Sequence, residues 1–117
     1  MNEAPPEHGP SLATIDDFKK LELRVAKVLE ARPHPNADKL LLLKIDVGGV
    51  EKQIVAGLRK WYSPESFVGR LIVVINNLQP AMLRGEESNG MLLAATSGDQ
   101  VVFLTPEREC VPGAKIS

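Results

Sequence analysis

Few side chains in this 117-residue chain have the type and spacing that catalysis requires. Asp46 and Glu51 come nearest to a carboxylate pair, but they flank a glycine turn at Gly48 and Gly49. General acid or base chemistry needs carboxylates whose pKa is shifted by their surroundings, whereas turn residues are usually solvated. We therefore expect this pair to belong to a turn rather than to an active site.

A second candidate is the segment NNLQPAMLRGEESNGMLLAA, residues 76–95. An apolar, strand-like run ends there, a charged loop with Arg84, Glu86 and Glu87 follows, and Gly90 leads into another apolar run. An active site, a binding edge and a simple connection are all open interpretations. Because the two acids have no partner base, metal ligand or nucleophile, they favour a binding edge, with the acids at its rim.

The sequence has few residues that could bind a metal ion or act as a nucleophile. The chain has two histidines, His8 and His34, and one cysteine, Cys110, whereas a structural zinc site needs about four such ligands. The motifs GxxxxGK(S/T), GxSxG, HExxH and CxxC are missing from the sequence. His34 stands between two prolines and is expected to hydrogen-bond backbone in a turn, with a role as base or phosphate contact as the alternative. These observations predict a non-catalytic domain without metal or cofactor.

Length and composition predict one soluble domain. No apolar run approaches 18 residues, and the N-terminus lacks a basic start followed by an apolar core, so neither a membrane span nor a secretory signal is expected. The single cysteine fits a reducing, cytoplasmic setting. Residues 1–13 are rich in proline and are predicted to be a flexible lead-in or linker, and residues 14–117 to form the domain.

The net charge of -1 hides an uneven distribution. Residues 19–60 hold ten basic and five acidic side chains, whereas the segments on either side are acidic. A local basic field can attract a polyanion, although a solvated, salt-bridged face is the commoner explanation. The basic side chains that could form a track across neighbouring strands are Arg24, Lys27, Arg32, Lys39, Lys44, Lys52, Arg59 and Lys60.

Patterning predicts a mostly β fold. Thr14 and Asp17 suit the start of a short helix from about Ile15 to Lys20, and SPESFVG, residues 63–69, suits a single capped helical turn. The rest divides into about six or seven short strands separated by turn signals. We expect a five-stranded Greek-key oligonucleotide-binding barrel with a short N-terminal helix and a C-terminal extension.

Aromatic content bears on the kind of nucleic acid. The chain has five aromatic residues: Trp61, Tyr62 and Phe67 cluster in sequence, and Phe18 and Phe103 are expected in the core. Single-strand binders usually stack bases on several exposed rings, so a basic surface poor in aromatics better suits the shape and backbone of a folded RNA.

Five segments together resemble a known family. DFKKLELRVAKVL, HPNADKLLLLKIDVG, KQIVAGL, VGRLIVVINNLQPAMLRGEESNGMLLAA and VPGAKI are similar, in order and spacing, to the tRNA-binding domain at the C-terminus of methionyl-tRNA synthetases and in free-standing tRNA-binding proteins. The domain of endothelial monocyte-activating polypeptide and the extensions of tyrosyl-tRNA synthetases are similar too. The resemblance covers nearly everything from Ile15 to Ile116.

The resemblance implies a non-catalytic homodimer that binds tRNA by shape and assists a methionyl-tRNA synthetase, with no DNA expected as a partner. By position it implies eleven tRNA-binding residues: Arg24, Lys27, His34, Asn36, Lys39, Asn77, Gln79, Arg84, Ser88, Asn89 and Met91. The basic members would contact phosphates, and the amide and hydroxyl groups would hydrogen-bond RNA backbone or 2′-hydroxyl groups. Residues 91–95 are expected in the core, with Met91 alone reaching the edge.

One alternative function stays open. Secretion-chaperone-like relatives share the barrel and the dimer plan, and an apolar groove at a dimer edge could hold extended polypeptide. HPNADKL and SNGMLLAA match the tRNA binders better.

Overall fold

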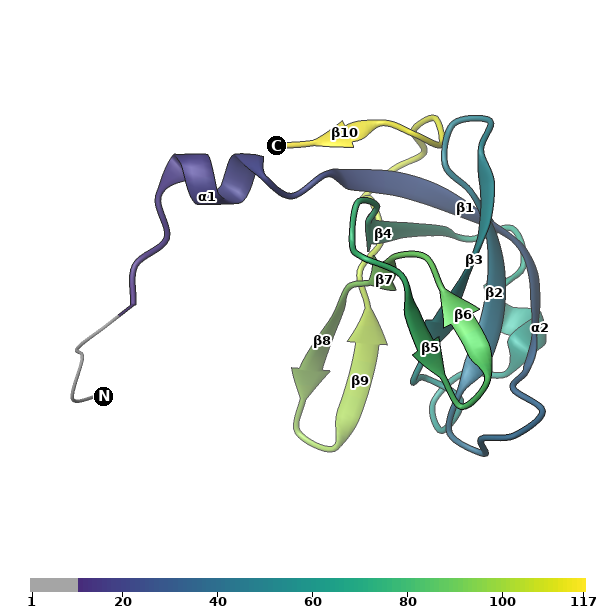
Figure 1. Ribbon diagram of the computed structural model, residues 1–117. Coiled ribbons are helices and arrows are strands. Elements are labelled where there is room, and N and C mark those ends of the chain that lie inside the picture. The colour runs from purple at the N-terminus through teal and green to yellow at the C-terminus, as the bar shows by residue number, and fades with distance from the viewer. Residues whose placement is uncertain (1–10) are drawn as a thin grey trace.

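The structure of the protein is a computed structural model, and it describes residues 11–117 (Figure 1). A helix, α1 (Ile15–Lys19), precedes the barrel, and a second helical turn, α2 (Pro64–Phe67), lies in the middle of the chain. Within this part of the chain the strands, in order, are β1 (Leu23–Pro33), β2 (Leu41–Asp46), β3 (Glu51–Ala56), β4 (Leu71–Ile75), β5 (Ala81–Leu83), β6 (Glu86–Ser88), β7 (Met91–Leu92), β8 (Ala94–Ser97), β9 (Gln100–Phe103) and β10 (Lys115–Ile116).

Strand β1 organises the barrel. Its first half pairs antiparallel with β4 and, at its very start, with β10, whereas its second half pairs with β2. The register shifts between Val28 and Glu30, and such a bulge bends a strand so that it can serve two neighbours. The main sheet therefore runs β3-β2-β1-β4-β7, a nearly closed barrel-like sheet. The predicted all-β oligonucleotide-binding barrel with a short helix is confirmed.

The two predicted helical segments form, with small differences. Thr14 and Asp17 make a reciprocal capping box at the start of α1, as the residue types suggested. Ser63 precedes α2 with Pro64 at its first position, but the Ser63 side chain makes no capping bond. Phe18 was expected in the core and is not there, because α1 projects away from the barrel and leaves this ring 37% exposed (Figure 1).

The core lies inside the barrel. Its largest fully buried side chains come from β1 to β4 and α2: Phe67, Leu41, Leu43, Ile45, Ile54, Ile72, Val28 and Val74. Tyr62, Phe67 and Phe103 pack against one another with ring centroids 5.0–5.2 Å apart and ring planes tilted by 35–58°, at separations that aromatic pairs favour. The predicted core position of Phe103 is confirmed.

Residues 76–95 differ from the loop that the sequence suggested. They form the hairpin β5–β6 and the short strands β7 and β8, which raises the strand total in the described residues above the expected six or seven. Residues 91–95 are half-buried or exposed rather than part of the core. A second hairpin, β8–β9, projects from the same side of the barrel as β5–β6 (Figure 1).

No helix within residues 11–117 has the length and apolar character that crossing a bilayer requires. The predicted flexible lead-in, residues 1–13, lies mostly outside the described residues.

Candidate nucleic-acid interface

Two segments far apart in the sequence meet at one end of the barrel. The turn HPNADK, residues 34–39, connects β1 to β2, and the tip of the β5–β6 hairpin lies against it. His34 Nε2 lies 2.8 Å from the Leu83 carbonyl oxygen, and Asn36 Nδ2 lies 3.4 Å from that of Arg84. Residues 36–40 and Arg84 line an open hollow of about 470 Å³. We call this turn together with the hairpin tip the tip surface.

The hairpin tip is built around an unusual backbone conformation. Leu83 and Glu86 face each other across β5 and β6, so Arg84 and Gly85 form a two-residue loop. Both have positive φ, 55° at Arg84 and 92° at Gly85, which is the type I′ turn that normally favours Asn-Gly. Arg84 is the non-glycine residue with positive φ in the described chain. A residue held in this costly conformation is a candidate for function.

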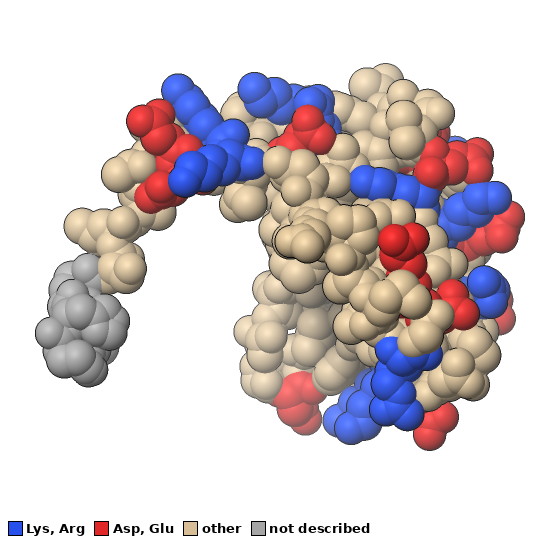
Figure 2. Space-filling model, viewed as in Figure 1, with Lys and Arg blue, Asp and Glu red and all other residues tan. Residues whose placement is uncertain are grey.

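The basic side chains at the tip surface are free to meet an anion. Lys39 and Arg84 are exposed, and within residues 11–117 neither forms an ion pair. Arg32 is also exposed, but it lies in β1 and lines the hollow that holds Glu30 and Lys44. Figure 2 shows basic side chains gathered at the end of the molecule where the β5–β6 tip lies. Each phosphate neutralised by such groups would release counterions and favour binding.

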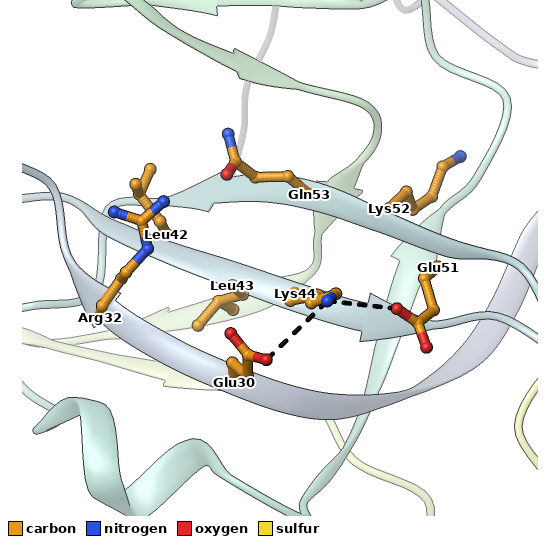
Figure 3. A pocket seen from close by; sticks show the side chains of 8 residues that line it. All are labelled: Glu30, Arg32, Leu42, Leu43, Lys44, Glu51, Lys52 and Gln53. Atoms are coloured by element: carbon orange, nitrogen blue, oxygen red, sulfur yellow. Dashed lines mark ion pairs between the residues drawn. The ribbon is translucent and has the colours of Figure 1, made fainter.

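Other members of the expected basic track are already engaged. Lys44 lies between Glu30 and Glu51 on the outer face of β1, β2 and β3, with Nζ–Oε distances of 3.8 and 3.3 Å (Figure 3). Lys52 Nζ donates to the Asn76 carbonyl and side-chain oxygens at 3.0 and 2.9 Å. The face of these strands is therefore charge-balanced rather than basic.

The start of β1 holds a separate group of predicted residues. Arg24 donates to the Gly113 carbonyl at 3.2 Å and lies 3.4 Å from Glu22 Oε2. Asn77 accepts from the Glu22 N–H at 2.7 Å and donates to the Lys20 carbonyl at 2.8 Å. Both side chains brace the ends of the chain against the barrel.

Lys27 is exposed but lies far along β1 from the tip surface. Its strand partner in β2 is Asp46, whereas Pro33 at the other end of the pairing faces Leu41. Six residues of extended strand separate Lys27 from Pro33, a span of up to about 20 Å. The structure does not bring Arg24 and Lys27 together with Lys39 and Arg84.

The base of the hairpin is fixed by buried hydrogen bonds. Ser88 is 5% exposed, and its hydroxyl accepts from the Val55 N–H and donates to the Gly90 carbonyl, each at 2.9 Å. The Asn89 N–H donates to the Gln53 carbonyl at 2.8 Å. Ser88 is thus engaged inside the protein rather than presented to RNA, and Asn89 is half-buried.

Sequence reasoning missed Gln53. Its side-chain amide donates to the Glu87 carbonyl at 2.9 Å and to Glu86 Oε1 at 3.2 Å, which ties β3 to β6. A lone glutamine in a strand pattern gave no signal, because its partners are more than thirty residues away.

The carboxylates of residues 11–117 that form short hydrogen bonds have structural partners. Asp46 Oδ1 accepts from the Gly49 N–H at 2.6 Å, so this acid closes the β2–β3 turn, as expected. Hydrogen bonds from the Asn76 amide and then from Arg24 lower the pKa of Glu22 from its ordinary 4.5, so this carboxylate has a structural role. In the part of the chain that the structure describes, no three His, Cys, Asp or Glu side chains gather to hold a metal ion.

Gln79 and Met91 lie elsewhere again. They line an apolar groove of about 470 Å³ whose floor is the end of β3 and whose walls include β5, β7 and β9. Leu78, Leu83 and Met91 are 39–45% exposed there. Figure 2 shows a surface with little charge between the two hairpins. We call this feature the apolar groove.

A family profile described as "Putative tRNA binding domain" matches residues 23–115. The chain belongs to this tRNA-binding domain family. The family is a binding domain, so the predicted tRNA-binding function and non-catalytic character are confirmed.

Methionine–tRNA ligase of Thermotoga maritima is 60% identical over 104 residues, which are 89% of this chain and 16% of the ligase. The same ligase of Thermococcus kodakarensis is 50% identical over 103 residues, 88% of this chain and 14% of the ligase. The chain thus spans about a sixth of the length of the curated relatives that it matches.

Solved structures agree with this membership. A MetRS related protein from Pyrococcus horikoshii superposes with a TM-score of 0.86 at 31% identity, covering 92% of this chain and 100% of that one. The chaperone CsaA from Bacillus anthracis superposes with a TM-score of 0.83 at 34% identity and the same coverage. The tRNA-binding domain and the chaperone-named protein therefore share one barrel.

Proposed function

We propose that this tRNA-binding domain holds tRNA mainly by its phosphate backbone at the tip surface. The observation that carries the proposal is the meeting of the HPNADK turn and the β5–β6 hairpin, which brings Lys39 and Arg84, neither of them ion-paired within residues 11–117, to one end of the barrel. Asn36, beside them, can hydrogen-bond phosphate or 2′-hydroxyl oxygens.

The chemistry of the tip surface favours backbone contacts over base stacking. Among the described residues, the hollow is lined by Asn, Ala, Asp, Lys, Leu and Arg side chains, without an aromatic ring. Without a ring to stack an unpaired base, discrimination among sequences is weak, and the shape of a folded RNA decides binding. We expect similar affinities for different tRNA species.

We further propose that the domain serves a methionyl-tRNA synthetase in the cytoplasm. Its ligase relatives are about six times longer than the matched region, so in those proteins the matched region is one part of a larger chain. A binding domain linked to a catalytic region, or associated with it, raises the local tRNA concentration without adding new chemistry.

The apolar groove supports a homodimer. Exposed leucine and methionine side chains that line one continuous groove are costly to leave in water, and such patches commonly mark protein interfaces. A second copy seated there would place two tip surfaces on one assembly, which suits a ligand as large as tRNA. Sedimentation should show a dimer at micromolar concentration, and Met91→Glu should shift it to monomer.

Titration with tRNA at several salt concentrations tests the main proposal. The logarithm of the association constant should fall linearly with the logarithm of the salt concentration. The slope should be about -0.7 to -0.9 for each phosphate contacted. Lack of tRNA binding even at low salt would overturn the proposal.

The apolar groove also keeps one alternative testable. If extended polypeptide occupied it, an unfolded protein would bind and tRNA would not displace it. If unfolded polypeptide does not bind under conditions in which tRNA binds, or if tRNA displaces it, the polypeptide alternative fails.

A further inference from the structure

The β5–β6 hairpin is positioned by side chains rather than by a backbone ladder. β5 and β6 pair only with each other, as a two-stranded sheet separate from the barrel sheet. At its base, Ser88 and Gln53 tie the hairpin to β3. At its tip, the contacts to the barrel come from His34 and Asn36.

His34 uses both ring nitrogens. The Asn36 backbone N–H donates to Nδ1 at 2.9 Å, so Nδ1 is the unprotonated acceptor. The Leu83 carbonyl can only accept, so Nε2, 2.8 Å away, carries the proton and donates. The two partners thus fix the neutral Nε2–H tautomer. The ring is 3% exposed, so it has no surface to offer to RNA directly.

We propose that His34 is a positioning residue that sets where Arg84 meets RNA. The inference rests on the proposed function of the tip surface. One nitrogen shapes the turn that carries Asn36 and Lys39, and the other holds the carbonyl of the residue directly before Arg84. The imidazole therefore joins the two halves of the tip surface into one preorganised unit.

The link to Arg84 is short in both chain and space. Leu83 ends β5, and Arg84 is the first residue of the two-residue turn. A carbonyl fixed at Leu83 limits the rotation of the peptide that leads into Arg84, whose backbone already has positive φ. If the bond is lost, the tip is held only by the bond from Asn36 and by the bonds at its base, and Arg84 loses its set position at the hollow that Lys39 also lines.

Two isosteric replacements separate the two hydrogen bonds. In His34→Gln the side-chain amide N–H can reach the position of Nε2 and keep the bond to the hairpin. In His34→Asn the side-chain oxygen can take the place of Nδ1 and keep only the bond within the turn. We expect tRNA affinity within about twofold of wild type for His34→Gln and about fivefold weaker for His34→Asn, a difference near 1 kcal/mol.

A double-mutant cycle with Arg84→Ala measures the coupling between His34 and Arg84 in tRNA binding. A general loss of stability would not produce such a coupling. If His34 acts by placing Arg84, His34→Asn should cost less than about twofold once Arg84 is already alanine. Folding of every variant is checked by circular dichroism and thermal melting. Long-range proton–nitrogen NMR spectra of the wild type should show the Nε2–H tautomer.

The outcomes are distinct. A wild-type domain that does not bind tRNA overturns the proposed function. A wild-type domain that binds, with His34→Asn costing the same in both backgrounds or His34→Gln losing as much as His34→Asn, overturns the positioning role alone. The positioning role is supported if His34→Gln keeps nearly wild-type tRNA affinity and if His34→Asn no longer weakens binding once Arg84 is alanine.

Discussion

Replacing Arg84 by asparagine should make the protein more stable and a weaker tRNA binder. The φ of 55° at this position lies in the left-handed region, where an ordinary residue costs about 1–2 kcal/mol and asparagine is several-fold better tolerated. Relief of part of that cost should raise the free energy of unfolding by about 0.5–1 kcal/mol. For a domain of this size, the melting temperature should rise by roughly 2–5 °C.

The same substitution removes a cation from the tip surface. Loss of one phosphate contact should lower the slope of log affinity against log salt by about 0.9 for a duplex arm, and the affinity at moderate salt by about tenfold. Binding is measured by fluorescence titration between about 50 and 200 mM salt. Stability is measured by thermal and urea unfolding.

Arg84→Lys is the matched control. Lysine keeps the charge and faces the same backbone cost, so its melting temperature should stay near that of the wild type and most of the salt slope should remain. If Arg84→Asn keeps the wild-type salt slope, Arg84 does not contact phosphate. If it lowers the melting temperature, the positive φ is not the source of strain.

The remaining predictions concern the scaffold. Gly113→Ala should destabilise the fold by more than about 2 kcal/mol in urea unfolding, because its Cβ would lie 2.8 Å from the backbone of the β2–β3 turn at φ +93°. Gly49→Ala is the control, because Gly49 has φ +99° but open space around it, so alanine there adds backbone strain without a close contact. An equal loss of stability in the two variants would show that the close contact at Gly113 is not responsible. Ser88→Ala should cost about 1–3 kcal/mol, because a buried backbone N–H loses its acceptor, and a melting temperature equal to that of the wild type would contradict this. The lowered pKa of Glu22 means that its carboxylate stabilises the fold above pH 4.5 and that this contribution is lost as the pH falls through the lowered pKa. Glu22→Gln should therefore be less stable than wild type at pH 7 and converge with it in acid, and a constant difference would show that the charge is not responsible.

Local patterns were enough for the elements and the class of fold. The Thr14 capping box, the proline at the first position of α2 and the glycine turn after Asp46 are each set by residues within a few positions of one another. The order of the HPNADKL and SNGMLLAA segments was likewise enough to indicate the tRNA-binding family. These features need no knowledge of distant contacts.

Exposure of individual side chains was less predictable. Phe18 and residues 91–95 are apolar and were expected inside, yet α1 leaves the barrel and β7 and β8 line the apolar groove. Apolar character shows that a side chain favours burial, but not whether this chain or a partner covers it.

By itself, the sequence determined the β-rich barrel, the helix caps and the residue types available at the tip surface. Only the tertiary structure decided which of those residues act together. It pairs Lys44 with two acids, commits Arg24 and Ser88 to internal bonds, and brings Lys39 to Arg84 through His34. The physical reason is that charge pairing and hydrogen bonding depend on distances of about 3 Å. Partners such as Lys44 and Glu51 lie 7 residues apart in the chain, and Arg24 and Gly113 lie 89 residues apart, so only the folded barrel sets such distances.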